Sequence, residues 1–115
     1  MSKKDLLLLL EPGFVDPGHP GERFVCRHCL PIEGLLAGDP ARAAQLEVRR
    51  LSFPRPRPEV IALLDEAHQS LPVLILGDEH PVPEDANTLS ATRFVNDVPR
   101  ILALLAARYG FSKVH

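Results

Sequence analysis

Leu6-Leu7-Leu8-Leu9-Leu10 is followed at once by Glu11-Pro12-Gly13. A short, unbroken apolar run that ends in turn residues is typical of a strand covered on both faces of a sheet. Five residues are too few to span a membrane or to form the apolar region of a secretion signal, and no small-residue cleavage site follows. We therefore expect an α/β protein that is soluble and cytoplasmic and has no membrane partner.

Strand and helix patterns alternate along the rest of the chain. The strand patterns cover residues 6–10, 46–53, 71–76 and 92–95. The helical patterns cover residues 32–38, 58–67 and 98–109, the last with Asn96-Asp97 as its cap and Gly110 at its end. The predicted order is β-α-β-α-β-β-α, a mixed four-stranded sheet with helices on both faces. Residues 11–25 and 77–91 are predicted loop excursions of a single domain, residues 1–115.

Composition narrows the function classes. The chain has 115 residues, a net charge of −2 and 24% charged residues, so it lacks the basic surplus expected of a nucleic-acid-binding protein. It contains no Walker loop, no G-x-G-x-x-G and no nucleophile elbow. These absences leave the cysteines as the residues with the strongest chemical signal.

The two cysteines lie close together, in Cys26-Arg27-His28-Cys29. Two cysteines cannot form a disulfide framework, and in a cytoplasmic protein this spacing indicates redox chemistry or metal binding. A zinc site would combine Cys26 and Cys29 with His19 and, for a fourth ligand, His28. The residues alone leave three interpretations open: a redox dithiol, a metal site, or a pair of cysteines with no catalytic role.

Three segments resemble the thioredoxin-like superfamily, and glutaredoxins and the N-terminal domain of glutathione transferases in particular. They are Phe24-Val25-Cys26-Arg27-His28-Cys29, Ser70-Leu71-Pro72-Val73-Leu74 and Phe94-Val95-Asn96-Asp97-Val98-Pro99-Arg100-Ile101. Their order and spacing carry the likeness, which covers nearly the whole chain. The chain also resembles a family of small bacterial proteins known only as a domain of unknown function. The resemblance implies a thioredoxin-like fold.

The resemblance also implies an activity, thiol–disulfide exchange. Cys26 would attack the disulfide, Cys29 would resolve the mixed disulfide, and no further cofactor would be required. Pro72 would follow a cis peptide bond, and Leu71 would offer its backbone to an extended thiol substrate. The substrate would be glutathione or a protein. Four more residues would hold the charged ends of glutathione, namely Asn96 and Asp97 for the ammonium group and Arg55 and Arg57 for a carboxylate.

Pro31 departs from this pattern. Proline is awkward inside a helix that starts at Cys26 and suits the first helical position, which would leave both cysteines ahead of the helix. A helix that starts near Pro31 favours the alternative function, a non-catalytic thioredoxin-like binding module, with or without zinc. Simpler interpretations also exist for Asp97, as a helix cap, and for Arg55 and Arg57, as solvated loop residues.

Overall fold

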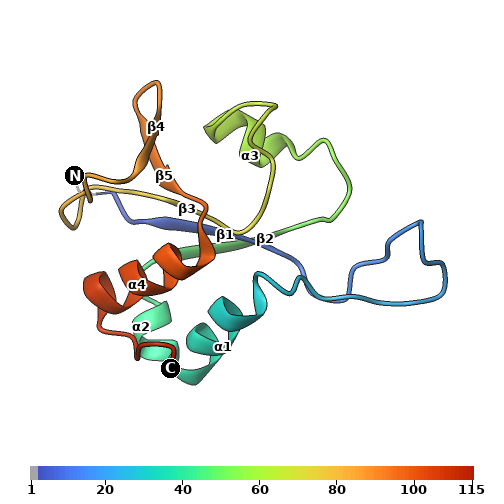
Figure 1. Ribbon diagram of the computed structural model, residues 1–115, viewed down its shortest axis with the longest axis horizontal. Coiled ribbons are helices and arrows are strands. Elements are labelled where there is room, and N and C mark those ends of the chain that lie inside the picture. Colours follow the sequence, from blue (N-terminus) through green and yellow to red (C-terminus); the bar gives the residue numbers. More distant parts are fainter. Residues whose placement is uncertain (1–2) are drawn as a thin grey trace.

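The computed structural model describes residues 3–115, which form a mixed α/β structure around one sheet (Figure 1). The strands of these residues are β1 (Leu6–Leu10), β2 (Glu47–Leu51), β3 (Val73–Ile75), β4 (Asn87–Leu89) and β5 (Thr92–Val95). Their helices are α1 (Leu30–Gly38), α2 (Pro40–Ala43), α3 (Pro58–Leu63) and α4 (Val98–Tyr109). The strands lie in the order β2-β1-β3-β5-β4.

β1 lies inside the sheet because its leucines are apolar on both faces, and all of them are buried. It runs parallel to β2, with Leu10 opposite Leu51, and antiparallel to β3, with Leu8 opposite Val73. β3 in turn pairs antiparallel with β5. The sheet is therefore mixed, as predicted. The ends of β1, β2 and β5 and the start of β3 therefore lie at one edge of the sheet.

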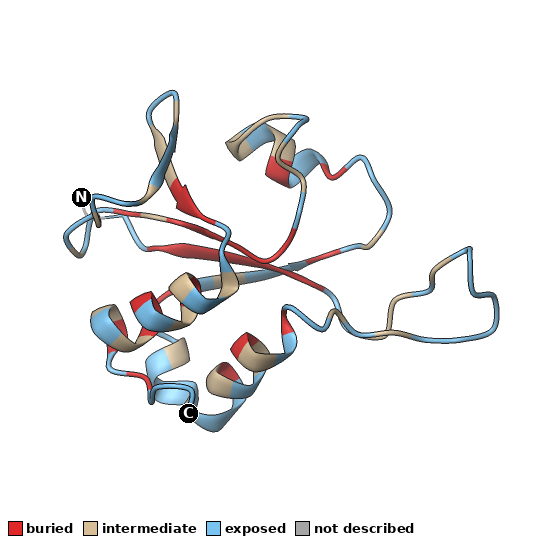
Figure 2. Ribbon diagram, in the orientation of Figure 1, coloured by how far each residue is buried: buried red, intermediate tan, exposed pale blue. Residues whose placement is uncertain are grey.

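Helices cover both faces of the sheet, as predicted. α1, α2 and α4 lie on one side of it and α3 on the other (Figure 1). α1, α3 and α4 each contribute buried residues to the core, including Ile32 in α1, Val60 in α3 and Ile101 in α4, and buried residues are red in Figure 2. Burial of such apolar stripes is what holds short helices on a sheet. No helix of the described residues is long and apolar enough to cross a membrane.

The caps of α4 are those predicted from the sequence. The Asp97 carboxylate accepts a hydrogen bond from the backbone N–H of Arg100 at 3.1 Å. Gly110 follows the last turn with φ of 80°, a left-handed conformation that suits glycine. Both ends of the helix are thus satisfied by residues adjacent to it in sequence, which explains why its bounds could be predicted.

The sheet has one more strand than predicted. β4 lies within the predicted loop 77–91 and forms a hairpin with β5, in which Ser90 has a positive φ of 53°. Asn87 and Thr88 in β4 are exposed, so no apolar pattern marks this edge strand in the sequence. The prediction of a continuous loop over 77–91 is therefore wrong.

Several other bounds differ from the predictions. The strand predicted over 46–53 is β2, and the strand predicted over 71–76 is β3, both shorter. The helix predicted over 58–67 ends at Leu63, and the exposed Ala67 lies beyond it. The short helix α2 was not predicted, although Asp39 caps it by accepting a hydrogen bond from the backbone N–H of Arg42.

A buried ionic network closes the opposite edge of the sheet, at the start of β1. The carboxylate of Asp5, which is fully buried, accepts hydrogen bonds from Arg108 Nε at 2.7 Å, from the Tyr109 hydroxyl at 2.5 Å and from the backbone N–H of Gly77 at 2.7 Å. Burial alone would raise the pKa of Asp5, but these hydrogen bonds outweigh it and lower the pKa. The network joins the end of α4 to β1 and keeps Asp5 ionised.

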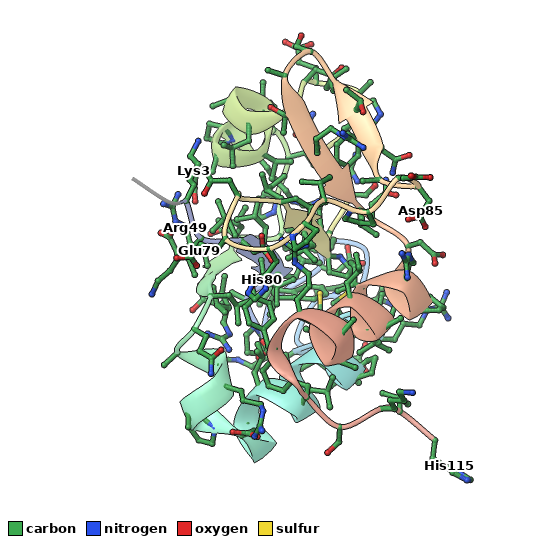
Figure 3. All side chains as sticks on the ribbon, turned by 90° about the vertical axis from the view of Figure 1, so that its left-hand side faces the viewer. Lys3, Arg49, Glu79, His80, Asp85 and His115 are labelled. Carbon is green, nitrogen blue, oxygen red and sulfur yellow. The ribbon has the colours of Figure 1, made fainter. Side chains whose placement is uncertain are left out.

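Close packing surrounds this network. A Cβ atom at Gly77 would lie 2.0 Å from the backbone oxygen of Lys3, so the chain can pass here only as glycine. His80 packs edge-on against the ring of Tyr109, with the ring centres 5.1 Å apart. Figure 3 looks toward this edge of the sheet, with Lys3 and His80 labelled.

Candidate functional site

A single turn positions the two cysteines. The carbonyl oxygen of Cys26 accepts hydrogen bonds from the backbone N–H groups of Cys29 and Leu30, each at 3.1 Å, and the carbonyl of Cys29 accepts one from Glu33 at 2.8 Å. α1 begins at Leu30, with Pro31 in its first turn. Because Pro31 has no N–H to donate, it suits the first turn of α1, whereas a helix starting at Cys26 would lack the hydrogen bond from residue 31 to residue 27. Both cysteines therefore precede the helix, and a helix start at Cys26 is ruled out.

The two thiols have different environments. Cys29 is 2% exposed and packs in the core, whereas Cys26 is half-buried. Burial raises the pKa of the Cys29 thiol to about 12, and the adjacent Cys26 and Glu33 add to the rise, against a backbone hydrogen bond from Leu10. Cys29 is therefore protonated at neutral pH. Cys26 is the thiol that a substrate can reach.

A pocket of about 660 Å³ opens beside Cys26. It receives residues from the cysteine turn, from the segments after β1, β2 and β5, and from the segment before β3. The lining residues are Leu10, Cys26, His28, Phe53, Arg55, Arg57, Ser70, Leu71, Pro72, Asn96, Asp97, Val98 and Pro99. The structure thus brings together every residue predicted for the thiol site except Cys29, which lines a neighbouring pocket with Cys26. The Leu71–Pro72 peptide bond is cis, as predicted.

Arg57 is held by backbone carbonyl groups. Its Nη1 donates to the carbonyl of Gln69 at 2.7 Å and its Nη2 to the carbonyl of Phe53 at 2.6 Å. The side chain is 6% exposed, and its buried Nε has no hydrogen-bond acceptor among the described residues. Arg55, two residues earlier, is exposed at the pocket. Of the two predicted arginines, one is therefore solvated and the other is buried.

Asn96 and Asp97 lie exposed where β5 leads into α4. One carboxylate oxygen of Asp97, Oδ2, is occupied in capping the helix, so the predicted capping role is confirmed. Asp97 also helps to line the pocket beside Cys26. Capping and ligand binding are thus compatible at this residue.

The structure does not gather the predicted zinc ligands. Residues 11–25 form an arm that extends away from the sheet (Figure 1), closed by a bridge between Phe14 and Phe24. His19 lies on this arm and packs edge-on against the ring of Phe24 at 5.6 Å. Across residues 3–115, no three His, Cys, Asp or Glu side chains are close enough to share a metal ion. The set of His19, Cys26, Cys29 and His28 therefore does not form a site in this structure.

Sequence reasoning missed several residues of the site. Phe53 lines the pocket and stacks on Phe14 of the arm, with ring centres 4.4 Å apart. Glu33 and Arg50, which form an ion pair at 2.7 Å, line a second pocket of about 380 Å³ that Cys26 also lines. No local pattern marks these residues, because their partners lie far away in sequence.

Comparison with known proteins identifies a family. Searches of curated proteins and of solved structures gave no significant match. A family model described as "Protein of unknown function (DUF3088)" matches residues 4–113. Because this match extends over nearly the whole chain, and over all the elements that line the pocket, the protein is a member of the DUF3088 family.

Proposed function

We propose that the protein has a thioredoxin-like fold and catalyses thiol–disulfide exchange at Cys26 and Cys29. The strand order β2-β1-β3-β5, with β1 and β2 parallel and the next pairs antiparallel, supports this fold. The single observation that supports the activity best is the pocket, where an accessible thiol meets Pro72, a buried arginine and a helix cap. Fold alone does not determine function, so the proposal depends on this site.

The proposed reaction uses the two thiols in turn. The Cys26 thiolate attacks one sulfur of a disulfide, forms a mixed disulfide and expels the other sulfur as a thiolate. Cys29 then loses its proton to a thiolate leaving group and attacks Cys26, which releases the second thiol. The substrate disulfide gains two electrons, and Cys26 and Cys29 become a disulfide. A thiol such as glutathione, or a protein dithiol, reduces this disulfide again.

The proposed substrate is glutathione or a protein thiol bound along the pocket. Leu71 lies directly ahead of β3, where its backbone could pair with an added extended strand. Asp97 would bind an ammonium group and Arg55 or Arg57 a carboxylate, and glutathione carries both groups. Beyond these thiols, the proposed reaction requires no cofactor.

The stoichiometry of reaction with a chromogenic aromatic disulfide tests the activity. The reduced protein should release about two equivalents of aromatic thiolate and end with an internal disulfide. Cys29→Ala should release about one equivalent and retain a mixed disulfide, detected as a mass adduct on Cys26. Cys26→Ala should react slowly, because Cys29 is buried. Failure of Cys26 to react faster than Cys29 would contradict the assignment.

A second function, non-catalytic binding at the same pocket, is favoured by one observation. α1 begins at Leu30, after both cysteines, so neither thiol lies within the first helical turn, where a helix dipole acts most strongly. A double variant, Cys26→Ala and Cys29→Ala, separates the two functions. If it binds glutathione as tightly as the parent, and the parent releases no aromatic thiolate, the protein is a binding module.

A further inference from the structure

Arg57 is a buried cation without a counter-ion. Its side chain makes no salt bridge with any carboxylate of the described residues, and both of its assigned acceptors are neutral carbonyl groups. Burying a charge in this way is costly unless an opposite charge lies nearby. Its free donor, Nε, is fully buried and has no acceptor. The position of Arg57 therefore suits a negative charge that exists only when a nearby group is ionised.

Arg57 and Cys26 line the same pocket, and this shared position identifies that charge. Burial is the main cause that lowers the pKa of Arg57, and the nearby Arg55 lowers it further. Negative charge on Cys26 and on Cys29 acts in the opposite direction and raises it. Of these two thiols, Cys29 is protonated at neutral pH, whereas Cys26 lines the same pocket as Arg57. The thiolate of Cys26 is thus the anion that fits this position.

We propose that Arg57 is the positioning residue that stabilises the Cys26 thiolate. This inference rests on the proposed thiol chemistry and adds to it the source of the stabilising charge. The residue is preorganised for that role: the carbonyls of Phe53 and Gln69 clamp its guanidinium, and its own backbone N–H donates to Gln69 Oε1 at 2.7 Å. A clamped cation needs no rearrangement when the thiolate forms.

Other charged groups also face Cys26. From the pocket side these are His28, Arg55 and Asp97, and from the second pocket they are Glu33 and Arg50. The first three are exposed, so solvent screens their effect. Glu33 is paired with Arg50, which leaves little net charge on that side. We therefore expect the buried Arg57 to influence the Cys26 thiolate more strongly than any of these groups does.

Alkylation of Cys26 by iodoacetamide measures the effect without requiring redox activity. The experiment uses Cys29→Ala as background, so that one thiol remains, and compares Arg57→Met with Arg57→Lys between pH 6 and 10. Below pH 8, Arg57→Met should slow alkylation about tenfold, the effect of one pH unit, and Arg57→Lys should restore most of the rate. At pH 10 the rates should converge, because the thiol is then ionised in every variant. A purely structural role would not give this pH-dependent pattern.

Arg27→Met is the matched control, since it removes the same charge from an exposed residue adjacent to Cys26. It should change the rate less than twofold at any pH. Equal effects of Arg27→Met and Arg57→Met, or no effect of Arg57→Met in a folded variant, would overturn the proposal. If the alkylation pattern appears but no disulfide is reduced, the proposed function fails and the role of Arg57 stands.

A measurement on the native sequence covers the case in which Arg57→Met does not fold. The NMR resonance of the Arg57 Nε–H group should shift with pH at the same midpoint as the alkylation rate of Cys26. After Cys26 has been carbamidomethylated, that pH-dependent shift should disappear. A resonance that does not respond to Cys26 would overturn the proposal.

Discussion

Each of the two edges of the sheet contains a buried charge, and the two charges have different partners. At the Asp5 end, formed by Asp5, Gly77, Arg108 and Tyr109, the carboxylate is surrounded by donors and one of them is a cation. At the Cys26 end, formed by the residues around the 660 Å³ pocket, the buried Arg57 has neutral acceptors and no anion. The Asp5 carboxylate, whose charge is fully paired, stabilises the structure. The Arg57 guanidinium, whose charge is unpaired, can still interact with a reacting group or a ligand.

Asp5→Asn should have the largest effect on stability. It removes the negative charge and leaves Arg108 buried without its partner, which typically costs about 3–5 kcal/mol. The free energy of unfolding in urea measures this loss. The control is Asp85→Asn, which removes the exposed ion pair with Arg100 and should leave stability unchanged within error. Similar effects of the two variants would mean that the ion pair at the Asp5 end does not stabilise the fold more than an exposed pair does.

Alkaline pH should destabilise the folded protein, because it contains the buried thiol of Cys29. The pKa of Cys29 is raised from 9.0 to about 12 in the folded protein, so above pH 9 the unfolded chain loses this proton first. Through this thiol, stability that is present below pH 9 should decrease as pH rises toward 12, by about 1.4 kcal/mol per pH unit, and the pKa of Tyr109, which burial also raises, adds to the loss above pH 10. Urea titrations at a series of pH values measure the slope. Cys29→Ala should have a shallower slope, and an unchanged slope would contradict the buried protonated thiol.

Gly77→Ala tests how tightly the Asp5 end is packed. The added Cβ would meet the backbone oxygen of Lys3 at 2.0 Å, and overpacking of this kind costs about 1–3 kcal/mol. Thermal unfolding followed by circular dichroism measures the change. Gly34→Ala in α1 is the control, because no atom lies within 4 Å of its Cβ position and alanine favours helix by about 1 kcal/mol. Equal destabilisation by both would contradict the close approach at Gly77.

Asp97→Ala should have the smallest effect on stability and the clearest effect on binding. Loss of the α4 cap costs about 1 kcal/mol, and loss of the carboxylate should weaken glutathione binding by about 1–3 kcal/mol. Calorimetric titration and thermal unfolding measure the two effects separately. Asp97→Ser keeps a capping side chain and removes the charge, so it should be stable yet bind weakly. Full binding by Asp97→Ser would rule out an ammonium site here.

The sequence was sufficient to predict the elements that carry strong local patterns. β1 was predicted with its observed bounds because five consecutive leucines fit a strand buried on both faces. α4 was predicted because an apolar stripe, Asp97 and Gly110 all lie within it or next to it. The roles expected of Cys26, Pro72 and Asp97 came from the resemblance to the thioredoxin-like superfamily, and the observed strand directions bring these residues to one edge of the sheet. β4 and α2 have no comparable local signal, and they were missed.

What the amino-acid order alone determined was therefore the set of strands and helices with clear periodicity. The tertiary structure decided which charges are buried and which find partners. Asp5 and Arg108 are 103 positions apart, and the carbonyl groups that hold Arg57 belong to Phe53 and Gln69, four and 12 positions away. Burial depends on how the folded chain packs around each side chain, whereas periodicity depends only on neighbours in the chain. For this reason the ionic network of the Asp5 end and the unpaired charge of Arg57 could be recognised only in the folded molecule.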